Sequence, residues 1–428
     1  MEFTTIVTLL VLVWIIIGFM SGKWSMGVVA MTGLVILEVT GVLTFKEAFE
    51  YIASNNVIMV GSTFILSGAL QKTSLVTKLR HWMLAHAKNG TAIVAMYLIA
   101  CVVMVQFVMP TALIAMLLPF MNALDKDSEV QPSNLLFPGV VVAHASQNAL
   151  PVGNALTGFI MLNAILEANG APGNAGPFST IKVGFVPCVL TLLYFIFIGW
   201  KRFPKRGYDT SAIKEYKDKE VTIPKWQETL IYVTFVTVMV LIVLKSALPD
   251  LIPVDLYMIA IIGDVILCLT HCMSVADVRN SMNIDTLFML TGVLPLGTAM
   301  QKTGAAEIVG NGIVKLLGGH PSYPVFLLAF MIVGGILTQF MSNSATNGVF
   351  RPLAIITAVT LGYNATGIAV ACGIMTTCAM LTPMGSPSLA IAYGAGQYNQ
   401  KELIKACLPA WIINTAAVFV MTLIFYPA

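Results

Sequence analysis

A polar stretch at residues 338–347 lies inside a long apolar run that extends from 326 to 361. Most of its residues carry a side-chain hydroxyl or amide. A bilayer core contains no water that could hydrogen-bond such groups. In a membrane-spanning segment they must therefore contact each other, a water-filled cavity or a bound solute, and the last two arrangements are functional. The stretch predicts a polar site at bilayer depth.

The composition favours a membrane protein. The chain has 428 residues, of which 57% are hydrophobic and 10% are charged, whereas soluble domains carry about 25% charged residues. Most apolar runs reach the roughly 20 residues that a helical span needs. The seven cysteines lie in or beside these runs and are interpreted as small packing residues. The expected fold class is an all-α polytopic membrane protein. Residues 1–5 lack the basic region of a signal peptide, so we expect the first apolar segment to remain as a span.

The apolar segments follow the same order in two halves. We expect each half to contain five spans, one of them broken, and one reentrant helical hairpin. The first repeat, 1–200, would comprise 3–20, 25–43, 54–71, the hairpin 91–124, the broken span 133–166 and 180–200. A basic cytoplasmic linker follows at 201–227. The second repeat, 228–428, would comprise 228–246, 253–271, 284–301, the hairpin 322–360, the broken span 365–395 and 404–426.

Three sequence matches in the same order support the repeat. Residues 69–73 match 299–303, Gln106-Phe107 with Pro119 matches Gln339-Phe340 with Pro352, and 151–153 match 383–385. The offsets are 230, 233 and 232 positions, which chance explains poorly. Five crossings is an odd number, so the second repeat is expected to be inverted relative to the first, as in many secondary transporters.

The basic residues indicate an orientation. With both termini outside, 17 of the 23 Lys and Arg residues fall on the cytoplasmic side and Arg351 lies within the membrane. The five on the outside are Lys46, Lys182, Lys245, Lys302 and Lys315. The positive-inside rule favours this topology in an inner or plasma membrane. Segments 45–51 and 274–282 precede the third span of each half and are expected to be short amphipathic helices at the interface, with ordinary loops as the alternative.

Four motifs are predicted to interrupt helices: 109–111, 150–154, 342–344 and 382–387. Proline removes a helical donor and glycine permits tight turns. A single proline can be a simple kink, but repeat-related pairs favour true breaks. The N-termini of half-helices favour anions, and their C-termini and free carbonyls favour cations.

These motifs resemble a known family. Residues 339–346, followed by Pro352, resemble the Ser-Asn-Thr signature on the hairpin tips of divalent anion/sodium symporters of the ion transporter superfamily. Residues 382–387, Thr-Pro-Met-Gly-Ser-Pro, are similar to that family's Thr-Pro-x-Gly-Thr-Pro break. The resemblance implies a scaffold domain and a mobile transport domain that moves like an elevator. It also implies a homodimer that carries di- or tricarboxylates, or sulfate, with sodium or by exchange.

The resemblance implies a site as well. Its substrate contacts would be Pro110, Thr111, Asn154, Ser342, Asn343, Ser344, Pro383 and Ser386. Its Na⁺ ligands, from the second half, would be Thr338, Met341, Asn343, Thr382 and Gly385. Weaker candidates are Gly153, Asn148, His144, Thr346 and Arg351. No organic cofactor and no nucleic-acid partner are expected.

The first half departs from the family pattern. Met109-Pro110 replaces Ser-Asn, and Val105 occupies the position that matches Thr338. A hard cation such as Na⁺ prefers several oxygen ligands, so we expect this half to have lost its sodium site or to retain only a weak one. Polar residues that could compensate are His144, Ser146, Gln147, Asn148 and Asn154.

Three ionisable residues inside apolar segments allow two interpretations each. Arg351 could bind an anionic substrate or extend to the interface as a snorkelling cation. Asp264 could bind a proton or cation, or pair with a scaffold residue. His144 could relay protons or be a hydrogen-bonded packing residue.

The leading hypothesis is a secondary active transporter of a small divalent anion, driven by Na⁺, by H⁺ or by anion exchange. The alternative is a cation-handling member of the same superfamily, such as a sodium/proton antiporter. An intramembrane enzyme is disfavoured because the sequence offers no nucleophile–base pair and no paired carboxylates.

Overall fold

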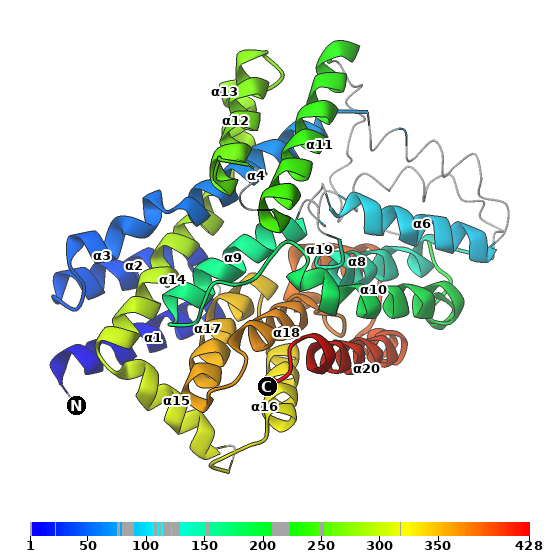
Figure 1. Ribbon diagram of the computed structural model, residues 1–428. Helices are drawn as coiled ribbons and strands as arrows, with labels where there is room; N and C mark the ends of the chain where they lie inside the picture. The colour runs from blue at the N-terminus through cyan, green and yellow to red at the C-terminus, as the bar shows by residue number, and fades with distance from the viewer. Residues whose placement is uncertain are drawn as a thin grey trace.

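The computed structural model describes residues 2–21, 23–74, 78, 90–106, 110, 113, 121, 129–150, 154–207, 223–248, 252–316 and 318–428. These residues form helices and no β-strand, which confirms the all-α prediction (Figure 1). In the first half the helices, with η for a 3₁₀ helix, are α1 Phe3–Ser21, α2 Met26–Val39, α3 Phe45–Phe49, η1 Glu50–Ala53, α4 Asn55–Gln71, α6 Gly90–Met104, η2 Pro132–Asn134, α8 Leu136–Ser146, α9 Asn154–Ala168, α10 Ser179–Phe197 and η3 Gly199–Arg202.

The second half is likewise helical. Its helices are α11 Lys225–Ala247, α12 Leu256–Leu269, α13 Val275–Ser281, α14 Ile284–Lys302, α15 Ala305–Leu316, α16 Tyr323–Leu337, α17 Asn343–Leu361, α18 Ala365–Thr377, η5 Pro383–Gly385, α19 Pro387–Ala395 and α20 Gln400–Phe425.

Helices α2 and α12 are shorter than the predicted spans 25–43 and 253–271. Each has 14 residues, and each is followed by a left-handed residue that turns the chain. These residues are Gly41 with φ 74° and His271 with φ 57°, 230 positions apart. The predicted spans were too long because apolar residues continue past the turn, and hydropathy does not register a change of backbone direction.

Helices α3 and α13 confirm the short helices predicted at 45–51 and 274–282. Each begins with a capping box, formed by Thr44 and Glu47 in α3 and by Ser274 and Asp277 in α13. In this motif the two side chains each accept from the other residue's backbone amide. Helices α3 and α13 thus begin with the same type of capping motif.

The capping-box acids also join the two halves. Glu47 of the first half pairs with Lys302 of the second, with 2.9 Å between carboxylate oxygen and ammonium nitrogen. Asp277 of the second half pairs with Lys72 of the first at 2.7 Å. The helices pack in the same crossed way, α2 against α14 and α12 against α4.

Four of the described helical segments are long and apolar enough to cross a membrane: Phe45–Gln71, Ser179–Phe197, Lys225–Lys245 and Gln400–Phe425. Six shorter apolar helices accompany them: Phe3–Phe19, Met26–Val39, Gly90–Met104, Leu256–Leu269, Tyr323–Leu337 and Ala365–Thr377. All ten overlap segments that the sequence predicts as spans, interface helices, hairpin arms or parts of a broken span, although several begin a few residues before the predicted start.

Helices α16 and α17 form a hairpin over the predicted segment 322–360. Phe330 and Phe350, on opposite arms, stack with ring centroids 5.3 Å apart. At the open end, the Tyr363 hydroxyl donates to the Pro321 carbonyl at 2.5 Å. The arms therefore run antiparallel, and the polar stretch 338–347 provides the turn and the first residues of the return arm.

Both predicted broken spans are interrupted. Helix α8 ends at Ser146 and α9 begins at Asn154. Helix α18 ends at Thr377, and an extended segment with η5 precedes α19. In the first hairpin, α6 covers the predicted first arm. Met109 and Thr111 of the predicted tip, and most of the predicted return arm, lie outside the described residues.

One helix was missed. The sequence prediction places no element between 303 and 321, yet α15 occupies Ala305–Leu316. It was overlooked because its apolar residues are spaced for one face of a helix and do not form a continuous run.

The helices enclose two hydrophobic cores. The smaller core contains buried residues of α11 and α12, one face of α4 and Phe159 of α9. The larger core is built from the other helices of both halves, including the hairpin and the two broken spans. Figure 1 shows α11 and α12 projecting from the rest of the molecule.

Candidate functional site

The tip of the α16–α17 hairpin meets the end of α18 through oxygen atoms. The Thr338 hydroxyl lies 2.7 Å from Asn343 Oδ1 and 2.7 Å from the Thr376 carbonyl oxygen. Asn343 Nδ2 donates to the Thr377 carbonyl at 3.0 Å. A hydroxyl carries one hydrogen, so Thr338 can donate to only one of its two neighbours. Three oxygens therefore share a single proton at this point.

The hairpin tip presents the start of α17 to this cluster. The first amides of a helix have no partner within it. Ser342 is the N-cap and accepts from one of them, Ala345 N, at 3.2 Å, which leaves the amides of Asn343 and Ser344 available to a ligand. The positive end of the helix dipole favours an anion here. Asn343 is buried and Ser344 is exposed, and the Thr346 hydroxyl bonds back to the Ser342 carbonyl at 3.1 Å.

Gln339 holds the break between α18 and α19 against the hairpin. Its Oε1 accepts from Met380 N at 3.2 Å and from Leu381 N at 2.9 Å, and the Thr382 hydroxyl donates to its carbonyl. Gln339 therefore satisfies backbone groups that the broken helix cannot pair. Its repeat partner Gln106 likewise bonds the break after α8, with Nε2 3.0 Å from the Ser146 carbonyl.

Gly385 brings the break close to the hairpin tip. A Cβ at this position would lie 2.1 Å from Ala379 Cβ, 2.8 Å from the Thr338 carbonyl oxygen and 3.2 Å from Asn343 Oδ1. Only glycine permits this approach. The structure thus places three predicted cation ligands, Thr338, Asn343 and Gly385, in one cluster. Met341 is half-buried at the tip.

His144 connects the first half to this cluster. Its Nε2 lies 2.9 Å from Ser386 Oγ and 3.0 Å from Ser388 Oγ, and its Nδ1 lies 3.5 Å from Asn343 Nδ2. Ser386 also caps α19 by accepting from Leu389 N. His144 is 4% exposed, and its partners match the hydrogen-bonded interpretation.

Arg351 is buried beneath the hairpin tip, with 5% of its surface exposed. This burial contradicts the interpretation of a snorkelling cation, which requires a wet head group. Its Nε donates to the Ala369 carbonyl at 2.7 Å. The guanidinium lies over Gly373, where a Cβ would come within 2.7 Å of Nη2.

A polar cavity of about 140 Å³ adjoins Arg351. Its lining includes Gln147, Asn148, Thr180, Asn347 and Thr377. At this cavity the break after α8 contacts the end of α18, because Asn148 Nδ2 donates to Thr377 Oγ1 at 3.3 Å.

The remaining predicted residues are placed as follows. Pro110 is helical and half-buried, and Pro383 begins η5. Thr111 and Gly153 lie outside the described residues, as does the side chain of Asn154. Sequence reasoning missed Thr180, Asn347, Thr376, Thr377 and Ser388. The pair Thr376-Thr377 just before a proline break was the available signal.

Asp264 lies away from the cluster, between α12 and α4, where Ser62 bonds its carboxyl group. Its Oδ1 has no partner among the described residues. Those residues also contain no group of three or more His, Cys, Asp or Glu side chains that could hold a metal. A cation at the hairpin tip would therefore be held by neutral oxygens.

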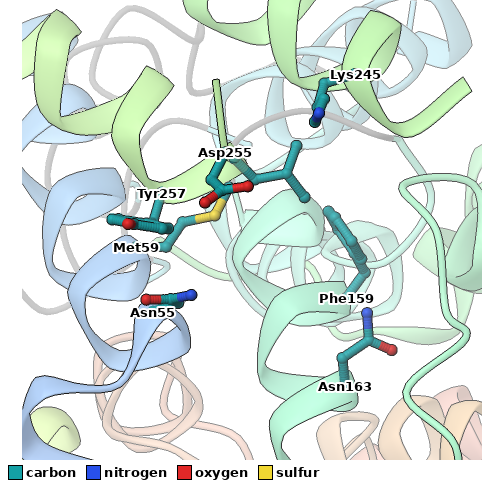
Figure 2. Close-up of a pocket in the computed structure, with 8 residues that line it drawn as sticks. Asn55, Met59, Phe159, Asn163, Lys245, Asp255 and Tyr257 are labelled. Atoms are coloured by element: carbon teal, nitrogen blue, oxygen red, sulfur yellow. The ribbon is translucent and has the colours of Figure 1, made fainter. Parts of the chain in front are cut away.

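A second, larger pocket of about 310 Å³ lies at the seam between α9 and the α4, α11 and α12 helices. Figure 2 shows Asn55 and Met59 of α4 facing Phe159 and Asn163 of α9 across it. The Asn163 side chain accepts from Ala175 N and donates to Ala175 O, each at 2.8 Å, so it holds the loop after α9.

Broken helices that meet at a buried oxygen cluster, within an apolar helical chain, are an arrangement that many secondary transporters share. The fold also has a solved counterpart. The YdaH transporter of Alcanivorax borkumensis superposes with a TM-score of 0.61 at 14% identity, over 89% of this chain and 87% of that one.

The family follows from the sequence comparison. Residues 12–377 match the model of the citrate transporter family, CitMHS, so the chain belongs to that family. Transporter MJ0672 of Methanocaldococcus jannaschii, which is uncharacterized, is 24% identical over 90% of this chain and 86% of its own length. Sodium/sulfate cotransporter 2 of Chlamydomonas reinhardtii is 24% identical over 45% of this chain and 22% of its own length. These matches agree with the resemblance to divalent anion/sodium symporters. The chain spans 31–39% of the length of the first three curated relatives that it matches.

Proposed function

We propose that this protein is a secondary active transporter of a small divalent anion, coupled to Na⁺, to H⁺ or to anion exchange. The observation that carries the proposal is the meeting of the hairpin tip with the α18–α19 break. It combines a helix N-terminus, which suits an anion, with a cluster of helix C-terminal carbonyls, which suits a cation.

The cation would bind among Thr338, Asn343, the carbonyls of Met341 and Thr376, and the backbone beside Thr382 and Gly385. Two observations support this choice. The crowded Thr338 hydroxyl leaves one neighbouring oxygen without a hydrogen, and neutral oxygens at this density suit a hard cation.

The anion would bind on the other side of the tip, at the free amides of α17. Ser342, Asn343 and Ser344 would contact it from the hairpin. Asn154, Pro383 and Ser386 would contact it from the breaks, and Pro110 and Thr111 from the first hairpin. Gly153, Asn148, His144, Thr346 and Arg351 would surround these contacts.

The two halves would be inverted repeats, and the unit that contains the hairpin would move relative to a scaffold as an elevator. The reciprocal ion pairs of Glu47 and Asp277 and the separate core around α11 and α12 support this division. The pocket in Figure 2 lies along the expected sliding seam. Family resemblance further favours a homodimer, in the inner or plasma membrane.

Uptake into proteoliposomes tests the proposal. Radiolabelled succinate, citrate and sulfate are offered with and without an inward sodium gradient, and at least one is expected to accumulate or to exchange. A sodium/proton antiporter is the alternative. Proton flux driven by sodium, without uptake or exchange of any of the three anions, would establish the alternative.

A further inference from the structure

Arg351 is a buried cation that forms no ion pair among the described residues. Within that part of the chain its guanidinium makes one hydrogen bond, from Nε–H to the Ala369 carbonyl. Burying an unpaired charge is costly unless another charge compensates it. The site therefore favours an anion next to this guanidinium.

Apart from Arg351, the polar residues that line this cavity in the described part of the chain are neutral. Gln147, Asn148, Asn347, Thr180 and Thr377 supply amides and hydroxyls. Thr180 is 3% exposed, and its buried hydroxyl has no hydrogen-bond partner among the described residues. A buried hydroxyl without a protein partner, in a residue that lines a cavity, is a group that a ligand can satisfy by a small side-chain rotation.

The distance between this cavity and the hairpin tip can be estimated along helix α18. The guanidinium lies at Gly373, and Asn343 bonds the Thr377 carbonyl. Four residues of helix separate these levels, which is about 6 Å. A solute with two separated acidic groups could therefore place one at the tip and the other at Arg351, whereas one compact oxyanion would reach only one of them.

We propose that this cavity is a second acid-binding subsite, with Arg351 as the charge partner of the distal carboxylate and Thr180 as a hydrogen-bond donor to it. The inference rests on the proposed transport function and narrows the substrate to anions with two separated acidic groups. Arg351 would supply part of the positive charge that a cation bound in the first half would otherwise provide.

Isothermal titration of the purified protein in sodium buffer tests the subsite, with succinate, its monoamide succinamate and sulfate as ligands. Wild type is expected to bind succinate more tightly than the other two. Arg351→Gln is expected to weaken succinate binding about 10- to 100-fold, as for hydrogen bonds to charged groups, and to remove the preference over succinamate. The exposed Arg279→Gln is the matched control.

Thr180→Val provides a test that does not depend on removing a buried charge. It replaces an unpaired hydroxyl by a methyl group of similar shape, so the empty protein should be as stable as wild type or more stable. Succinate affinity should fall about three- to tenfold, with succinamate affinity unchanged.

Wild-type succinate affinity in both variants would overturn the subsite and leave the proposed function standing. Tighter binding of sulfate than of succinate by the wild type would overturn the two-acid assignment. An absence of binding and transport of succinate, citrate and sulfate would overturn the proposed function and this inference with it.

Discussion

Single residues at the hairpin tip have roles that depend on distances of a few ångströms. Gly385 is the sharpest case, because a methyl group there would overlap Ala379 and press on the Thr338 carbonyl. Thr338 and Asn343 form the same cluster. A change at Gly385 therefore acts on the oxygens of the proposed cation site, even though glycine has no side chain to offer.

Gly385→Ala is expected to destabilise the protein by about 1–3 kcal/mol, the usual cost of overpacking, and to remove the stabilisation that sodium gives. Thermal unfolding in detergent, with sodium or with choline as the cation, measures both effects. Gly312→Ala is the control, because a Cβ there meets nothing within 4 Å and alanine favours a helix by up to about 1 kcal/mol. Sodium-dependent stabilisation equal in both variants would contradict this role for Gly385.

Asn343 and Met109 lie in corresponding motifs of the two halves, where Ser342-Asn343 answers Met109-Pro110, and they should differ in importance. Asn343→Ala removes contacts to Thr338 and Thr377 and is expected to reduce anion binding more than tenfold. Met109→Ala is expected to have a mild effect, because the first half lacks the family's oxygen ligands. Equal losses in a binding assay would refute the asymmetry between the halves.

At the scale of elements, α3 and α13 attach each half to the other. A hydrogen bond from Lys72, followed by the backbone amide of Ser274, lowers the pKa of Asp277 from 3.8 to about 2. A lowered carboxyl pKa stabilises the folded state above the unfolded value and loses that contribution as pH falls through the folded value. The Lys72–Asp277 ion pair should therefore stabilise the folded state across the physiological pH range.

Asp277→Asn should lower stability at pH 7 by no more than about 1 kcal/mol, since both partners are partly exposed. The difference from wild type should persist down to pH 4 and shrink as pH approaches 2. Unfolding curves across this pH range provide the measurement. If the difference in stability between wild type and variant disappeared already near pH 6, the loss would not come from the Lys72–Asp277 ion pair.

The sequence predicted most elements and part of the site. Hydropathy located the spans, and the polar motifs located the second hairpin and both breaks, because a backbone interruption in an apolar segment requires Pro, Gly or polar residues. The sequence prediction missed the residues that reach the site only through the three-dimensional fold. Thr376 contributes a carbonyl, which every residue has. Thr180 reaches the Arg351 cavity from the first turn of α10, which is far from the hairpin in sequence.

At the scale of the whole molecule, the expected topology places both termini outside and the linker 201–227 inside. Cys268 is the one exposed cysteine of the seven, so Cys268→Ser gives a low-background starting variant. A membrane-impermeant maleimide should then label Glu2→Cys in intact cells, and Lys217→Cys only after permeabilisation. The reverse pattern would invert the assigned orientation.

If the proposed elevator movement carries Arg351, its guanidinium would also make transport responsive to voltage. A transport unit that carries this residue across the bilayer moves one positive charge when it is empty. Each charge that crosses a full potential of 100 mV exchanges about 2.3 kcal/mol with the field. An inside-negative cell would then draw the unloaded unit inward and retard its return, whereas one bound dianion with one sodium ion would cancel the arginine and make the loaded step electrically silent.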